Sequence, residues 1–94
     1  RTNQLEGYVY VIGLDAYPGK FKIGHANDVV RRIRELGVSV PAPFIVQHYV
    51  FFGDSAWAEK QMHQLLSKNR IRGEWFDAPL KTIISNLTKL SERG

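Results

Sequence analysis

The chain begins with two segments of strand-like composition that flank a turn. Residues 8–12 are rich in β-branched and aromatic side chains, and residues 21–23 repeat that pattern. Asp15 and the pair Pro18-Gly19 lie between them, and these residue types favour turns. This order predicts a hairpin with a loop of moderate length, so an antiparallel sheet is expected at the start of the fold.

Three later segments carry apolar residues at the spacing of a helix. Each follows residues that commonly begin a helix: Asn27 and Asp28, Asp54 and Ser55, and Asp77 with Pro79. The expected apolar faces are Val29, Val30, Ile33 and Leu36 in the first helix, Ala58, Met62, Leu65 and Leu66 in the second, and Leu80, Ile83, Ile84, Leu87 and Leu90 in the third. Gly37 is expected just after the end of the first helix, where glycine is common.

Two further strands complete the expected fold. Residues 44–52, which follow Pro41 and Pro43, form an apolar and aromatic run that predicts a buried central strand. Residues 74–76 predict a short edge strand after a basic loop around residues 68–72. The predicted class is therefore α+β: a small antiparallel sheet of about three strands plus a short edge strand, flanked by helices in the order β-β-α-β-α-β-α.

Length limits the domain organisation. Ninety-four residues correspond to one small domain, residues 1–94. Because the sequence starts at Arg1 rather than Met, we expect this domain to be cut from a longer protein that carries a further domain.

Composition limits the environment and the partners. The absence of cysteine excludes disulfides and thiolate metal sites and fits a reducing compartment, so a cytoplasmic or nuclear location is expected. No apolar run approaches the length of a bilayer span, so no membrane partner is expected. The net charge of +4 and the pI near 9.6 favour a polyanionic partner.

Five short motifs follow one another along the chain. They are Val-Tyr-Val at 9–11, Lys-Ile-Gly at 22–24, Asp28 followed four residues later by Arg32, Ala-Glu-x-x-x-His at 58–63, and Gly-Glu-Trp-Phe at 73–76. In this order they resemble the GIY-YIG nuclease superfamily, and its phage-type branch above all. The resemblance covers roughly residues 7–78, which is most of the chain.

The resemblance implies a role for each matching residue. Tyr10 stands where the tyrosine of the GIY motif stands, and Lys22 takes the first position of YIG, which is lysine in this branch. Gly24 matches the final glycine, where the chain is expected to pass close to its neighbours. Arg32 matches the helix arginine, and Glu59 matches the carboxylate that binds a divalent ion. The resemblance therefore implies an endonuclease with Mg²⁺ or Mn²⁺ as its cofactor and with nucleic acid, DNA first, as its partner.

The chain departs from the family pattern at three points. The first triad is Val-Tyr-Val instead of Gly-Ile-Tyr, and Ala26 stands where a threonine is often found. The late asparagine of the broader family has no clear counterpart, with Asn69 and Asn86 as the candidates. The missing asparagine bears on contacts to the phosphate more than on the chemistry.

Cleaving a phosphodiester bond with water needs a base, a cation on the phosphoryl oxygens and help for the leaving oxygen. A tyrosine, with a reference pKa of about 10, is a weak base unless its phenolate is favoured. Lys22 on the paired strand is expected to lower the pKa of Tyr10 through its charge. Glu59 offers the hard oxygen ligand that Mg²⁺ prefers, and Arg32 is expected to bind the phosphate through two hydrogen bonds, which lysine cannot reproduce.

Neighbouring residues are expected to support this site. Tyr8 lies on the same strand face as Tyr10, so it either competes for the same role or positions the water. His25 is either a proton shuttle and phosphate donor or a loop residue without a role. His63 lies one helical turn from Glu59, as an orienting group or as a neutral surface contact.

The basic residues outside the motifs have two interpretations. Arg31 is expected to point away from the core, toward phosphate or solvent. Lys68, Arg70 and Arg72 form either a solvated face or a track for phosphates, and the salt dependence of binding would distinguish the two.

Three functions remain open from the residues alone. The favoured one is a Mg²⁺-dependent endonuclease domain acting on DNA, and the alternative is a catalytically inactive nucleic-acid-binding module of the same fold. A protein-interaction domain that uses exposed aromatic residues is the third. Under the alternatives, Tyr10 is an ordinary half-buried strand tyrosine and Lys22 an exposed strand lysine. Glu74 and Trp75 are expected to close the edge of the core rather than to do chemistry.

Overall fold

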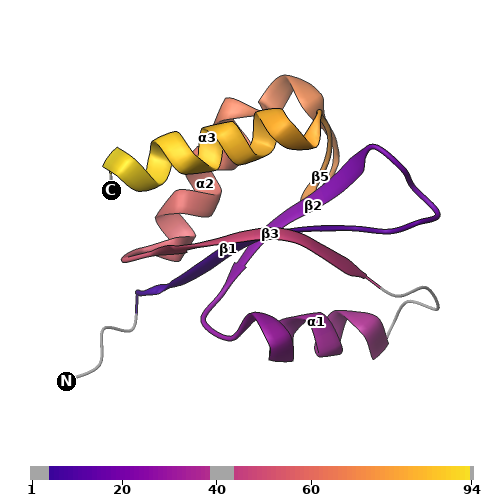
Figure 1. Ribbon diagram of the computed structural model, residues 1–94, viewed down its shortest axis with the longest axis horizontal. Coiled ribbons are helices and arrows are strands. Elements are labelled where there is room, and N and C mark those ends of the chain that lie inside the picture. The colour runs from indigo at the N-terminus through magenta and orange to yellow at the C-terminus, as the bar shows by residue number, and fades with distance from the viewer. Residues whose placement is uncertain (1–4, 39–43, 94) are drawn as a thin grey trace.

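The computed structural model describes residues 5–38 and 44–93, which form one sheet with helices on both faces (Figure 1). The strands in this part of the chain are β1 (Gly7–Gly13), β2 (Lys20–Ala26), β3 (Ile45–Phe52), β4 (Arg70–Arg72) and β5 (Trp75–Asp77). The helices are α1 (Val29–Val38), α2 (Ser55–Leu65) and α3 (Leu80–Arg93), with a short 3₁₀ helix, η1 (Ser67–Asn69). The sheet has the order β3-β1-β2-β5-β4 with antiparallel pairing throughout, which confirms the predicted α+β class.

The predicted hairpin of β1 and β2 lies at the centre of the sheet. In the loop between them, the backbone N–H of Lys20 donates to the carbonyl of Tyr17 at 3.2 Å. Gly19 has a φ of 80°, a conformation that glycine adopts without strain. The pairing places Tyr10 opposite both Gly24 in β2 and Tyr49 in β3.

The hydrophobic core lies on the face of the sheet that α2 and α3 cover, and α1 lies on the opposite face (Figure 1). Val9, Val11 and Ile23 point into this core and meet Met62 of α2 and Ile83 of α3. Each of these side chains is fully buried, and such burial contributes roughly 1.5–3 kcal/mol for one side chain. This layer therefore carries most of the packing that holds α2 and its side chains in place.

Side chains cap α1 and α2 at the predicted positions. Asp28 Oδ1 accepts a hydrogen bond from the backbone N–H of Arg31 at 3.0 Å, and Asp54 Oδ1 accepts one from that of Trp57 at 3.1 Å. None of the helices in the described part of the chain combines the length and the apolar character needed to cross a membrane.

Three predictions about the helices are wrong in detail. α1 continues through Gly37 to Val38, so Gly37 does not follow its end; glycine costs only about 1 kcal/mol inside a helix and does not by itself end one. Val30 and Leu65 are both exposed rather than on core-facing sides. Next to Leu65, Leu66 takes the buried position, whereas Val29, next to Val30, is partly exposed.

β3 is an edge strand, so the prediction of a buried central strand over residues 44–52 is wrong. Of the described strands, only β1 pairs with it, and its Tyr49 and Phe51 are 58% and 52% exposed. An apolar run shows that a segment is extended, but not whether it has a neighbour on its second side. Pro41 and Pro43 lie outside the described residues.

The predicted basic loop contains a further strand. Arg70–Arg72 form β4 at the edge of the sheet, so β5 lies between β2 and β4 and is not the edge strand that was predicted. The sheet therefore has one strand more than the predicted order. A segment of three residues is too short for its pattern to identify a strand.

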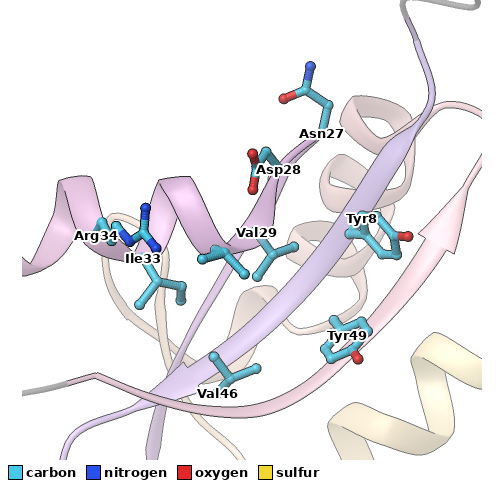
Figure 2. A pocket seen from close by; sticks show the side chains of 9 residues that line it. Tyr8, Asn27, Asp28, Val29, Ile33, Arg34, Val46 and Tyr49 are labelled. Carbon is cyan, nitrogen blue, oxygen red and sulfur yellow. The ribbon is translucent and has the colours of Figure 1, made fainter.

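α1 covers its face of the sheet only in part. A groove of about 630 Å³ separates it from β1 and β3 (Figure 2), and we call it the α1 groove. Its lining includes Tyr8, Val30, Ile33, Arg34, Val46 and Tyr49. The groove is mostly apolar, and it lies on the same face of the sheet as Tyr10.

Candidate active site

Tyr10 and Gly24 approach each other closely across β1 and β2. A Cβ atom at position 24 would lie 2.6 Å from Tyr10 Cζ and 3.1 Å from Oε1 of Glu74. Packed protein interiors leave no space for such an overlap, so only glycine makes room for the phenol here. The close approach expected at Gly24 is confirmed. Tyr10 itself is 1% exposed, so it is not the half-buried strand tyrosine of the alternative interpretation.

Arg32 of α1 reaches the hydroxyl group of Tyr10 and donates a hydrogen bond to it. The pKa of Tyr10 is nevertheless raised above its ordinary value, chiefly because the side chain is buried. The hydrogen bond and the charge of Arg32 oppose this shift, whereas the charges of Glu74 and Glu59 add to it.

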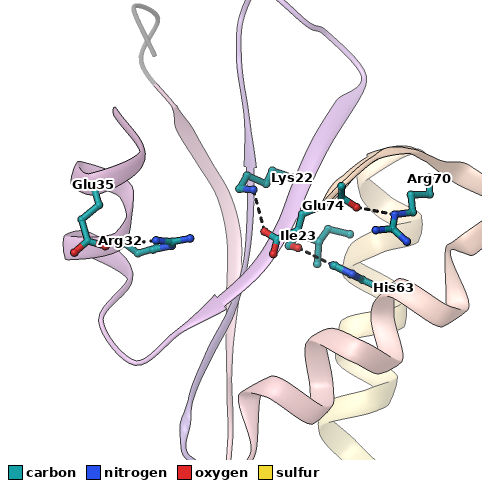
Figure 3. Close-up of polar contacts among 8 residues, drawn as sticks. Lys22, Ile23, Arg32, Glu35, His63, Arg70 and Glu74 are labelled. Atoms are coloured by element: carbon teal, nitrogen blue, oxygen red, sulfur yellow. Dashed lines mark hydrogen bonds and ion pairs between the residues drawn. The ribbon is translucent and has the colours of Figure 1, made fainter. Parts of the chain in front are cut away.

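The expectation that Lys22 lowers the pKa of Tyr10 is wrong. The net shift is upward, and the group that favours the phenolate is Arg32. The reason lies in the partner of Lys22. Its Nζ lies 2.9 Å from Oε1 of Glu74, so a carboxylate balances its charge beside the phenol (Figure 3).

Glu74 belongs to this cluster although no chemical role was predicted for it. It follows Gly73, whose φ of 56° allows the turn between β4 and β5. The carbonyl of Glu74 accepts a hydrogen bond from the backbone N–H of Ile23 at 2.9 Å, which holds the turn against β2. Its carboxylate thereby comes next to Gly24 and Lys22. The signal in the sequence that could have identified Glu74 was its place in the Gly-Glu-Trp-Phe motif.

Lys22 is therefore not an exposed strand lysine. Its side chain is only 14% exposed, against 36% for that of Glu74. An ion pair that is mostly withdrawn from water loses more hydration than a surface pair, and its members are held in one geometry. This arrangement keeps an ammonium group at a defined position beside Gly24.

Glu59 reaches the same cluster from α2. It is half-buried, and its pKa is raised, first by burial and then by the negative charge of Glu74. The charges of His25, His63 and Lys22 lower it. The charges that act on Glu59 are thus those of Glu74, Lys22 and the two histidines.

Groups from both faces of the sheet meet here because β5 covers only part of β2. The pairing of β2 with β5 runs from Lys20 to Lys22 and stops there. The helices α2 and α1 lie on opposite faces of the sheet (Figure 1). Glu59 therefore belongs to the helix on one face, whereas Arg32 belongs to the helix on the other (Figure 3).

His63 fastens α2 to β2. Its Nε2–H donates to the carbonyl of Ile23 at 2.9 Å, and its ring lies 5.0 Å from that of Phe76. These contacts fix the turn of α2 that carries Glu59, which favours the orienting role over a neutral surface contact. His25 is exposed at the end of β2, where its Nδ1 lies 3.3 Å from Ser55 Oγ.

Tyr8 does not compete with Tyr10. Its ring packs edge-on against Tyr49, with centroids 5.8 Å apart, and against Phe51, with centroids 5.5 Å apart. It lines the α1 groove instead of the cluster around Gly24. Arg31 is exposed, as expected.

The other basic candidates lie at the β4 edge of the sheet. Lys68, Arg70 and Arg72 are exposed there, on η1 and β4, with β5 between them and β2. Arg70 Nε donates to the carbonyl of Gly73 at 2.7 Å. Asn69 donates to the carbonyl of Asp77 at 3.0 Å, so its side chain ties this edge together.

The carboxylates at the site fit a magnesium ion in number and type. Among the described residues, no three histidine, aspartate or glutamate side chains are grouped so that they could hold a metal. Mg²⁺ does not require such a group, since it commonly binds one or two carboxylates and keeps several waters. Glu59, with Glu74 as a neighbouring acid, meets this requirement, and a cation would relieve the repulsion that raises the pKa of Glu59.

Comparison with protein families gives a match over most of the chain. The T5orf172 domain matches residues 7–91, a range that runs from the start of β1 nearly to the end of α3. It includes every residue of the cluster around Gly24. No curated protein and no solved structure matches the chain.

Proposed function

The chain belongs to the T5orf172 domain family, and from this we propose that it is a Mg²⁺-dependent endonuclease domain that hydrolyses phosphodiester bonds in DNA. T5orf172 domains are found in phage and related nucleases. One observation carries the proposal. A phenol, a guanidinium, an ammonium and two carboxylates from four separate elements and a turn converge around Gly24.

Arg32 and Tyr10 act together in the proposed reaction. The guanidinium covers the phenol in the free protein, and a phosphate is the stronger acceptor for it because the hydrogen bonds to an anion are charge-assisted. Binding of the scissile phosphate brings a phosphoryl oxygen against Arg32, which stays beside the phenol. Tyr10 first releases its own proton to solvent, a loss that Arg32 favours. The phenolate oxygen then orients the attacking water and takes one proton from it, which restores the neutral phenol, while the hydroxide attacks the phosphorus and the leaving oxygen departs.

Three charged side chains set the electrostatic potential at the cluster around Gly24: Lys22, Glu74 and Glu59. Glu74 holds Lys22 beside Gly24, where the ammonium attracts the phosphate without free movement of its long side chain. Glu59 would hold Mg²⁺, which supplies positive charge for the phosphoryl and leaving oxygens when bound. His63 keeps Glu59 in position through its bond to β2.

Nicking of supercoiled plasmid and cleavage of single-stranded DNA, with and without Mg²⁺ or Mn²⁺, test this proposal. We expect metal-dependent cleavage that Glu59→Gln abolishes, since the amide keeps the shape but loses the charge. Glu92→Gln is the matched control, because Glu92 is an exposed glutamate of α3. Equal cleavage by the two variants would contradict the assignment of Glu59.

Two arginines on different helices give a second, sharper comparison. Arg32→Lys is expected to slow cleavage about 10²–10³-fold, the usual cost of removing one hydrogen-bond donor to transition-state charge. Arg93→Lys should cleave at nearly the wild-type rate, because Arg93 is exposed in the last turn of α3 and outside the cluster. Near-equal rates for both variants would argue against a role for Arg32.

The alternative is a catalytically inactive DNA-binding module, and one observation favours it. Tyr10 is 1% exposed and its pKa is raised, so it is a weak base in the free protein. Firm DNA binding without cleavage under any divalent ion would support the module over the enzyme.

A further inference from the structure

Exposed aromatic and apolar side chains extend from the α1 groove along β3. Val30 and Val46 stand at the groove, Tyr49 lies in its lining, and Phe51 continues the same face of β3. All four are exposed. Exposed apolar side chains that adjoin one another on a soluble domain commonly mark a binding surface.

The aromatic side chains of this surface are held in place before any ligand binds. Tyr8, Tyr49 and Phe51 form what we call the aromatic cluster. The ring of Tyr8 lies at 78° to that of Tyr49 and at 73° to that of Phe51. These edge-on contacts fix the two outer rings and leave about half of each side chain in solvent. A ligand that stacks on them has little side-chain entropy to overcome.

The charge beside the groove suits a polyanion. Arg34 lines the groove, and the exposed Arg31 lies on the same helix. Neither guanidinium takes part in an ion pair among the described residues. Among the described residues that line the groove, Asp28 is the one acid, and its Oδ1 already caps α1 by accepting the N–H of Arg31.

The groove also adjoins the cluster around Gly24. Tyr8 and Tyr10 are alternate residues of β1 and point to the same face of the sheet, and Tyr49 pairs with Tyr10 across the two strands. A strand of nucleic acid whose phosphate lies at Arg32 therefore passes the groove with its adjacent nucleotides.

We propose that the α1 groove and the aromatic cluster bind unpaired nucleobases of a DNA strand that runs into the cluster around Gly24. This inference rests on the proposed function, which makes DNA the substrate, and it adds that the substrate is single-stranded beside the cleaved bond. Bases stack on Tyr49 and Phe51, because every nucleobase presents an apolar ring face and aromatic platforms bind single strands without regard to sequence. Arg34 and Arg31 contact the phosphates.

A second copy of the chain is a less suitable occupant. β3 is an edge strand and offers free backbone groups for pairing. However, a two-fold dimer brings the same patch against itself, so the arginines beside one groove would face those beside the other. The net charge of +4 adds to this repulsion, whereas it favours a nucleic acid.

Binding of labelled oligonucleotides in the presence of EDTA tests the inference without cleavage. The probes are a short single-stranded oligothymidine and an abasic strand of the same length, which has the same phosphates but no bases. Tyr49→Ala and Phe51→Ala are each expected to weaken binding of oligothymidine about tenfold, and to leave binding of the abasic strand unchanged. Tyr49→Phe should restore the wild-type affinity, because the ring is kept.

Tyr17→Ala is the matched control, since Tyr17 is an equally exposed tyrosine in the loop between β1 and β2. It should bind both strands as the wild type does. The inference is overturned if wild type binds both strands equally, or if the aromatic variants bind oligothymidine as tightly as Tyr17→Ala. It is also overturned if sedimentation shows a dimer that Tyr49→Ala dissociates. The proposed nuclease activity stands or falls separately, because only the assays with metal detect cleavage.

Discussion

At the level of single residues, the contacts of a position explain why one residue type is required there. Gly24 is needed because the ring of Tyr10 occupies the space of a side chain at that position. Burial and the charges of two carboxylates disfavour the phenolate form of Tyr10, whereas Arg32 favours it. Each of these residues has its properties from its neighbours and not from its type alone.

Gly24→Ala should lower the free energy of unfolding by about 1–3 kcal/mol, the usual cost of adding a methyl group to a packed site. The phenol of Tyr10 cannot easily move away, because it is buried and bonded to Arg32. Urea unfolding measures the change. Gly53→Ala is the control, since a Cβ atom there meets nothing within 4 Å, and a Gly24 variant as stable as this control would contradict the close approach.

The titration of Tyr10 gives a second prediction at this scale. The difference in phenolate absorbance between wild type and Tyr10→Phe should have its midpoint above the ordinary tyrosine value of 10.0. Arg32→Ala should move this midpoint further up, because it removes the group that favours the phenolate. Glu74→Gln should move it down, because it removes a negative charge. Shifts in the same direction would contradict the arrangement.

The same shift predicts the effect of pH on stability. The folded state holds the proton of Tyr10 more tightly than the unfolded chain does, so this group contributes stability below the unfolded pKa of about 10. That contribution is lost as the pH rises through the higher folded pKa. Tyr10→Phe should therefore lose less stability than the wild type in this alkaline range.

At the level of helices and strands, α2 decides where the acid of the site lies. Asp54 caps its first turn, and His63 joins it to β2 one turn after Glu59. The end of the β5 pairing at Lys22 leaves space for this contact. The position of Glu59 is thus set by a helix that is fixed at two points.

His63→Ala should destabilise the fold by about 1–3 kcal/mol, because the carbonyl of Ile23 loses its partner in a partly buried place. Urea unfolding again measures the change. Gln64→Ala is the control, since Gln64 is the next residue of α2 and its side chain is exposed. We expect the control to stay within about 0.5 kcal/mol of wild type, and a His63 variant of equal stability would exclude the anchoring role.

At the level of the whole molecule, the sheet separates α1 from α2 (Figure 1). The helices α1 and α2 lie on opposite faces (Figure 1), and the pairing of β2 with β5 ends at Lys22. The basic residues of η1 and β4 lie along the next edge. A nucleic acid bound at the cluster around Gly24 therefore has a positively charged surface on one side and the α1 groove on the other.

The role of the β4 edge in binding stays a prediction that salt dependence tests. Replacing Lys68 and Arg72 by glutamine should weaken duplex DNA binding and reduce the slope of log affinity against log salt by about 1 for each lost phosphate contact. The matched control replaces Lys81 and Lys89, which are exposed on α3. An equal slope for both double variants would show that the β4 edge is only a solvated face.

The sequence alone determined the parts of this protein that depend on local order. The hairpin, the capped starts of α1 and α2 and the apolar face of α3 follow from turn residues, capping side chains and helical periodicity, which act within a few positions. It also pointed to Tyr10, Lys22, Arg32 and Glu59 through motifs that the fold brings together. Only the tertiary structure decided that β3 is an edge strand, that Glu74 holds Lys22 and that burial raises the pKa of Tyr10. These properties depend on which distant segments become neighbours, and no local pattern of residues carries that information.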